Sequence, residues 1–293
     1  MDLFSQIENN EREEILALRK ELVEANHKYY VENAPTLSDY EFDQKLRRLQ
    51  DLEALYPDMF DANSPTQHVG SDLNAPESVS LEDGAKSAYS LEVKGKGKGF
   101  EQVAHKYPML SLSNSYSRED IADWISKLPA DVEIVCELKY DGLSISLWYE
   151  NGVLTKALTR GDGVKGDNVV ENIRTIASVP QRIGDEERGF VELRGEVLLP
   201  WAAFEKLNKE REEQEEALFA NPRNAASGTL KLQDPNEVAK RGLDCYLYYM
   251  LGEDLPAQTH YERLEIAKKW GFNISDAVKV CHGLDEVMEY IAY

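Results

Sequence analysis

The pattern of hydrophobic and polar positions divides the chain into a helical beginning, a polar middle and a longer mixed part. Over residues 7–31 the apolar side chains recur at helical spacing, which predicts an amphipathic helix. A second helix is predicted to begin at Ser38 and end before Pro57, because Ser38 and Glu41 have the spacing of a capping box. These helices predict a small helical module over residues 1–70.

The middle stretch, residues 71–104, is poor in apolar side chains and contains the basic tract Lys94-Gly95-Lys96-Gly97-Lys98-Gly99. One interpretation of this tract is a phosphate-contacting loop. The alternative, a flexible linker, is favoured because nothing in the sequence fixes the backbone of such a glycine-rich polar segment. We therefore expect residues 71–104 to be a linker or insertion.

From residue 105 the pattern becomes mixed. Alternating or continuous apolar runs predict strands at 132–138, 143–150, 153–159, 190–199 and 243–250. Helical spacing predicts helices at 118–127, 200–218, 259–270 and 284–292. Asn151-Gly152 is a hairpin signal between two strands, and Asp162-Gly163 marks a tight turn. Because no regular strand–helix–strand spacing appears, we expect an antiparallel-rich α+β domain over residues 105–293.

Composition narrows the function classes. A net charge of −21 over 293 residues argues against this chain alone binding duplex DNA strongly. The three cysteines form no C-x-x-C pair, so neither a disulfide framework nor a zinc site is expected, and Cys136 and Cys245 are interpreted as core residues. With no signal-peptide pattern and no apolar run near the ~18 residues that span a bilayer, we predict a cytoplasmic protein without a membrane partner.

The segment Lys139-Tyr140-Asp141-Gly142 directly follows the predicted strand 132–138. A lysine at a strand end, beside an acid and a glycine, can act as a nucleophile once burial or a neighbouring cation lowers its pKa. If the strand continued, Glu137, Lys139 and Asp141 would share one face, and Gly142 would let a ligand approach the backbone. Taken alone the motif is short, and a surface lysine is the competing interpretation.

Further blocks in the same order give the lysine its context. They are Asp39-Tyr40-Glu41-Phe42-Asp43, Pro108-Met109-Leu110-Ser111-Leu112-Ser113-Asn114, Cys136–Gly142, Thr159-Arg160-Gly161-Asp162-Gly163, Glu192-Leu193-Arg194-Gly195-Glu196-Val197 and Asn221-Pro222-Arg223-Asn224-Ala225-Ala226-Ser227-Gly228. This series resembles the bacterial NAD-dependent DNA ligases over essentially the whole chain. The resemblance implies an ATP-grasp-like ligase nucleotidyltransferase fold for residues 105–293.

The resemblance also implies the chemistry. Lys139 would attack the α-phosphate of NAD, forming a lysyl-adenylate and releasing nicotinamide mononucleotide; in the full-length enzyme AMP then passes to the 5′-phosphate of a DNA nick, which is sealed. By the same resemblance the nucleotide is bound by Ser111, Leu112, Glu137, Asp141, Gly142, Arg160, Glu196, Arg223, Lys231 and Tyr248.

Several of these residues have plainer interpretations. Asp141 could equally cap a turn, Glu137 could face solvent, and Tyr248 could be an ordinary sheet tyrosine. Arg194 and Glu196 would otherwise be interpreted as a strand-surface charge pattern. Lys231 departs from the family, which commonly has arginine there.

In the helical module the resemblance assigns the nicotinamide portion to Tyr29, Tyr30, Asp39, Tyr40, Glu41, Phe42 and Asp43. Asp39 and Asp43 are four residues apart on one helix face, and carboxylates and aromatic rings suit a cationic ring with ribose hydroxyls. The competing interpretation is an acidic helix surface. Phe42 stands where the family usually has tyrosine, which predicts a lost hydrogen bond and weaker NAD binding.

Two lysine-bearing blocks of the family, D-G-V-V-x-K and W-A-x-A-x-K-F-P, do not occur in this sequence, nor do its OB-fold, zinc module, helix-hairpin-helix repeats and terminal interaction domain. We therefore expect a truncated, N-terminal part of a ligase that binds NAD, self-adenylates poorly and seals no nicks. Its expected metal is Mg²⁺, with Mn²⁺ as a substitute and zinc confined to the absent part.

The expected partners are NAD and, for the full-length enzyme, nicked double-stranded DNA, with a monomeric chain. Two other functions compete with this one: a covalent nucleotidyltransferase that uses ATP, and a non-catalytic NAD- or nucleotide-binding fragment.

Overall fold

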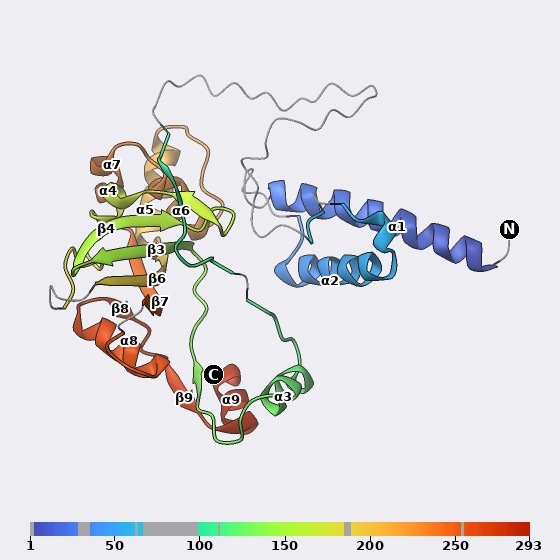
Figure 1. The fold of residues 1–293 in the computed structure, drawn as a ribbon. Coiled ribbons are helices and arrows are strands. Elements are labelled where there is room, and N and C mark those ends of the chain that lie inside the picture. The colour runs from blue at the N-terminus through green and yellow to red at the C-terminus, as the bar shows by residue number, and fades with distance from the viewer. Residues whose placement is uncertain are drawn as a thin grey trace. The chain divides into compact units, whose positions relative to one another are not determined.

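The computed structural model describes residues 3–28, 36–61, 64–66, 99–110, 112–184, 189–252 and 255–293. The chain divides into two compact units, Met1–Glu101 and Gln102–Tyr293. Each is described by itself below, with elements labelled as in Figure 1. Within the described ranges no helix is both long and apolar enough to cross a membrane.

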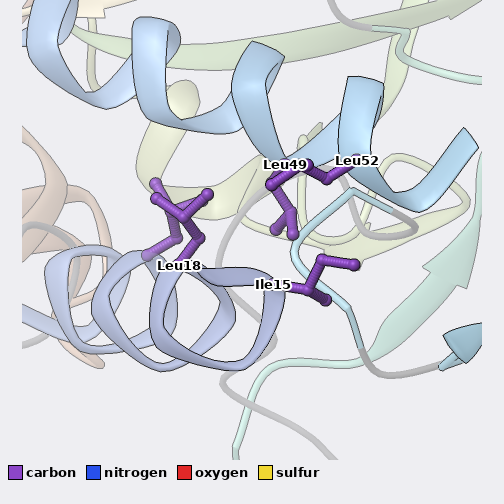
Figure 2. Close-up of a cluster of buried hydrophobic side chains, with 5 residues drawn as sticks. Ile15, Leu18, Leu49 and Leu52 are labelled. Carbon is purple, nitrogen blue, oxygen red and sulfur yellow. The ribbon is translucent and has the colours of Figure 1, made fainter. Parts of the chain in front are cut away.

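The first unit is built on two helices, α1 (Leu3–His27) and α2 (Asp39–Leu55), followed by the 3₁₀ turn η2 (Pro57–Met59). The core between them, of which Figure 2 is a close-up, consists of Ile15, Leu18, Leu22, Leu49 and Leu52. The predicted capping box is confirmed: Ser38 accepts a hydrogen bond from the Glu41 N–H, and the Glu41 carboxylate accepts one from the Ser38 N–H.

The second unit contains a five-stranded sheet in the order β4-β3-β6-β7-β8 (Figure 1). Its strands are β3 (Leu143–Glu150), β4 (Val153–Thr159), β6 (Phe190–Leu198), β7 (Asp244–Gly252) and β8 (Asn273–Ile274). Every pairing is antiparallel except β7 with β8, which confirms the antiparallel-rich α+β prediction. Positive φ angles at Asn151 and Gly152, 50° and 74°, close the predicted hairpin between β3 and β4.

The second unit also contains α-helices. They are α3 (Arg118–Ser126), α4 (Val170–Ile173), α5 (Trp201–Glu213), α6 (Pro222–Leu230), α7 (Pro235–Lys240), α8 (His260–Lys269) and α9 (Gly283–Ala292). The prediction of a helix over 200–218 is wrong at its end, because Glu215 adopts a left-handed φ of 57° and breaks the helical path.

The helix α6 was not predicted, because it contains serine and glycine and has little helical periodicity. It forms because Asn221 caps its first turn, Pro222 occupies a first-turn position, and Ala225 and Ala226 are fully buried. Its stability therefore comes from packing more than from its residue types.

Two short pairings complete the second unit: β1 (Gln102–Ala104) with β5 (Lys165–Asp167), and β2 (Ile134–Cys136) with β9 (Lys279–Cys281). The predicted strand 132–138 is thus too long, since only its central three residues pair. That pairing belongs to a separate small cluster in which Ile134, Cys281 and Val287 are buried. The chain from 137 to 142 consequently runs between two sheets and is not part of either.

Candidate active site

The lysine segment, residues 137–142, connects β2 to β3 and is held at its downstream end. The Gly142 N–H donates to Oε1 of Glu196 at 3.3 Å, and the Gly142 carbonyl accepts from Nε of Arg223 at 3.2 Å. Nη1 of Arg223 also lies 3.5 Å from Oδ1 of Asp141. The side chain of Lys139 remains exposed. An anchored backbone therefore presents an accessible amine.

The strand β2 does not continue through this segment. Glu137, Lys139 and Asp141 therefore lie outside any strand. The expectation that they would share a strand face is wrong. Arg223 links Asp141 to the rest of the lysine segment, because it contacts both the Asp141 carboxylate and the Gly142 carbonyl.

Gly142 is required by the protein's own packing. A Cβ at this position would lie 2.3 Å from the Val197 carbonyl oxygen and 2.5 Å from Cδ2 of Leu198. From the sequence, Gly142 was expected to let a ligand approach the backbone; in the structure the β6 backbone lies directly against it.

Glu196 has a clearly shifted pKa. It lies opposite Ser144 in the β3–β6 ladder and accepts a hydrogen bond from the Ser144 hydroxyl at 2.9 Å. Burial raises the pKa of Glu196 to about 7, while its hydrogen bonds and the Lys139 charge oppose that rise. The positive charge of Lys139 therefore stabilises the ionised form of this carboxylate.

Tyr248 lies on β7 beside a β-bulge, where the register with β6 shifts between Arg194 and Gly195. Burial and the charge of Glu196 raise the pKa of Tyr248 to about 12, with opposing effects from Ser144 and the charges of Arg194 and Arg160. The charges of Glu196 on β6 and of Arg160 after β4 thus both affect the pKa of Tyr248 on β7.

Arg194 anchors the loop that leads to Ser111 and Leu112. Its guanidinium donates to Oε1 of Glu192 at 2.7 Å and to the carbonyl oxygens of Tyr107 and Pro108 at 2.6 and 3.1 Å. The Glu192 side chain is 0% exposed and that of Arg194 only 12%. The interpretation of Arg194 as surface charge is therefore wrong.

The same loop is tied to the turn that follows β4. Met109 N–H donates to the Gly163 carbonyl at 2.9 Å, and Nε2 of His105 donates to the Arg160 carbonyl at 3.0 Å. Burial lowers the pKa of His105, so its ring is neutral near pH 7. Leu112 is exposed, and Ser111 lies outside the described residues.

His260, at the start of α8, contacts the lysine segment and was not predicted from the sequence. Its Nε2 donates to Oε1 of Glu137 at 2.6 Å. The two residues are 123 positions apart. The capping box of Thr259 and Glu262 could have placed His260 in a first helical turn, but no local signal pairs it with Glu137.

Two family models match this chain. Residues 97–293 match the family model of the NAD-dependent DNA ligase adenylation domain, and residues 8–70 match that of the DNA ligase-like, N-terminal NAD+-binding domain. The chain belongs to the NAD-dependent DNA ligase family.

Relatives named DNA ligase are similar over nearly the whole chain. That of Parabacteroides distasonis is 55% identical over 95% of this chain, and that of Bacteroides fragilis is 52% identical over 96%. That of Phocaeicola vulgatus is 51% identical over 97%. These matches cover 39%, 40% and 40% of the relatives, so the chain spans about 40% of the length of the curated ligases it matches.

Within this ligase chain, the helical unit gives its predicted residues different surroundings. Tyr40 is exposed and Asp43 half-buried, whereas Phe42 packs against the core cluster and Glu41 closes the capping box. Tyr29, Tyr30 and the side chain of Asp39 lie outside the described residues. Phe42 therefore has a packing role within its own unit.

Lys231 is the C-cap residue of α6 and is exposed. Arg223, at the other end of the same helix, reaches the lysine segment. The role of Lys231 in the ligase stays a prediction.

Proposed function

We propose that this chain carries out the adenylation step of NAD-dependent DNA ligation. The Nζ atom of Lys139, after losing its proton, attacks the α-phosphorus of NAD. A phosphorus–nitrogen bond forms, the bond from that phosphorus to the bridging oxygen breaks, and nicotinamide mononucleotide leaves. The chain then carries a lysyl-adenylate.

The observation that carries this proposal is the anchoring of the lysine segment. Glu196 and Arg223 hold the backbone N–H and carbonyl of Gly142, while the amine of Lys139 stays exposed. A nucleophile on an ordered backbone loses little further freedom when it meets a bound phosphate, and such positioning is a large part of catalysis in phosphoryl transfer.

The adenylate is assigned to the surroundings of Glu196. Glu196 would accept from ribose hydroxyls, Arg160 would donate to ribose and phosphate, and Tyr248 would stack on adenine. The effects of Glu196 and Arg160 on the pKa of Tyr248 support the assignment. Glu137, Ser111 and Leu112 are proposed for the adenine side, and Asp141, Gly142, Arg223 and Lys231 for the phosphate side.

The nicotinamide half of NAD is assigned to the first unit. The exposed ring of Tyr40 and the carboxylate of Asp43 lie one turn apart at the start of α2, and such groups suit a cationic ring. Tyr29, Tyr30 and Asp39 are proposed to join them. The family match over residues 8–70 favours NAD over ATP as the adenylate donor.

Magnesium is proposed to enter with the phosphates. In the part of the chain that the structure describes, no three His, Cys, Asp or Glu side chains form a metal cluster. Mg²⁺ needs few protein ligands, since it keeps several waters and binds one or two carboxylates with substrate phosphates. The exposed Asp141 carboxylate, two residues from Lys139, fits that mode. The bound ion would neutralise phosphate charge, and Mn²⁺ would substitute.

Intact-mass analysis after incubation with NAD and Mg²⁺ tests the proposal. We expect an adenylyl mass increase with NAD and none with ATP. The increase should vanish in Lys139→Ala and persist in Lys240→Ala, a control lysine paired with Glu237 on α7. An equal increase with ATP would favour a different donor, and an increase in Lys139→Ala would remove the nucleophile assignment.

Nucleotide binding without chemistry is the second candidate. No mass increase, together with calorimetric binding of nicotinamide mononucleotide, would favour a recognition fragment. Transfer of AMP to a nick and its sealing are proposed for the longer ligase, and with a net charge of −21 this chain is expected not to seal nicks by itself.

A further inference from the structure

His260 supplies a fixed point at the upstream end of the lysine segment. Its Nε2 donates to Oε1 of Glu137 at 2.6 Å, and only 28% of the histidine side chain and 21% of the glutamate side chain are exposed. The imidazole is itself held, because the Thr259–Glu262 capping box defines the start of α8 and the ring lies 5.6 Å from that of Tyr249 on β7. A side chain at the capped first turn of α8 therefore contacts the Glu137 carboxylate.

The segment needs such a contact because no strand pairing spans it. The strand β2 ends at Cys136 and β3 begins at Leu143. Arg223 and Glu196 hold Gly142 at the downstream end. Glu137 is two residues before Lys139, so its bond to His260 restrains the backbone on the other side of the nucleophile.

We propose that His260 is a positioning residue for adenylation, which holds the Lys139 backbone in place through Glu137. This inference rests on the proposed function, because it concerns the same step. The residue type matters as well. The contact is made through Nε2, which glutamine can imitate with its amide nitrogen, whereas alanine has no donor there.

The test compares the full chain with His260→Ala, His260→Gln, Glu137→Ala and the double variant Glu137→Ala/His260→Ala. One readout is amide hydrogen exchange of peptides covering residues 137–142, which does not depend on activity. The other is the single-turnover rate of Lys139 adenylation, followed by intact mass over a range of NAD concentrations. His282→Ala is the matched control, because His282 is 62% exposed and contacts Glu133 and Glu286 away from the segment.

We expect His260→Ala to speed exchange within residues 137–142 and to lower the maximal adenylation rate on the order of tenfold, as for loss of a hydrogen bond to a charged group. The half-saturating NAD concentration should change little. His260→Gln should recover most of the rate. In the Glu137→Ala background, loss of His260 should have little further effect, because His260 acts through Glu137.

Unchanged exchange and rate in His260→Ala would overturn the proposal, and so would equal losses in the alanine and glutamine variants, which would indicate that the ring only fills space. Should His260→Ala fail to fold, His260→Asn takes its place, since its shorter amide does not reach Glu137. If the unaltered chain is not adenylated by NAD, the proposed function fails for this chain, and the exchange data alone decide whether His260 orders the segment.

Discussion

At the scale of single residues, burial changes the chemistry of groups whose sequence context looks ordinary. Glu196 stands in an alternating strand pattern, yet burial raises its pKa to about 7 even though hydrogen bonds from Ser144 and the Gly142 N–H oppose the rise. Arg194 and Glu192, in the same strand, form a buried ion pair, and Arg194 also donates to the Tyr107 carbonyl of a loop. Three charged side chains of one strand are thus buried or half-buried and hydrogen-bonded.

The raised pKa of Glu196 predicts a pH-dependent effect on stability. Between about pH 4.5 and 7 the unfolded chain ionises this group while the folded chain keeps it protonated, so stability falls as the pH rises through that window. Glu196→Gln, which cannot ionise, should differ little from the unaltered chain at pH 5. At pH 8 it should be more stable by up to roughly 3 kcal/mol.

Chemical denaturation at pH 5 and pH 8 measures this difference, with Glu262→Gln as an exposed-glutamate control whose pKa is lowered and not raised. An equal effect of Glu196→Gln at both pH values would show that Glu196 ionises normally in the folded chain.

Gly142 provides a second prediction at this scale. Gly142→Ala would drive a methyl group into the Val197 carbonyl, so we expect destabilisation of roughly 1–3 kcal/mol, as for other overpacked sites, together with loss of adenylation. Gly189→Ala is the control, because no atom lies within 4 Å of its added Cβ. Thermal unfolding and intact-mass adenylation are the measurements, and a fully active, equally stable Gly142→Ala would contradict the packing argument.

At the scale of elements, local signals decide where helices start and tertiary packing decides which short segments become helices or strands. The capping boxes before α2 and α8 are both complete in the structure. By contrast β2 keeps only three paired residues of a longer apolar run, because its partner β9 is equally short. The end of β2 leaves the lysine segment outside any sheet.

The capping box of α2 predicts a measurable contribution to the first unit. Ser38→Ala removes the acceptor for the Glu41 N–H and should lower the stability of that unit by about 1 kcal/mol. Thr259→Ala, the equivalent change before α8, should instead affect the second unit by a similar amount. Denaturation followed by hydrogen exchange assigns each loss to its unit, and a loss in the wrong unit would refute the assignment.

At the scale of the whole molecule, the chain is organised as two units with separate cores. Ile15, Leu22 and Leu49 belong to the first core, while the second surrounds the sheet that contains Ile145 and Leu193. The expected domain boundaries at 70 and 104 stay a prediction, although the two family matches cover residues 8–70 and 97–293.

Separate cores predict separate folding. A chain of residues 102–293 should fold alone and unfold at the same denaturant concentration as the second unit of the intact chain. Circular dichroism and hydrogen exchange of the two chains provide the comparison. A large loss of stability on removal of the first unit would show that the second depends on it.

The sequence alone determined the features with strong local or motif signals. Ser38 and Glu41 specify a helix start, Asn151-Gly152 specifies a hairpin, and alternation over 143–159 specifies its strands. The ordered motif blocks indicated the NAD-dependent DNA ligase family, which the family models confirm. Such signals can be recognised in the sequence because each depends on a few neighbouring residues or on residue identities at fixed spacing.

Only the tertiary structure decided how the segment around Lys139 is held. The contact of Arg194 with Tyr107 spans 87 positions, and that of His260 with Glu137 spans 123. The packing of Gly142 against Val197 and the pKa of Glu196 likewise depend on enclosure by strands distant in sequence. No hydrophobic period or turn preference encodes such pairings, because they arise only when the sheet has brought the elements together.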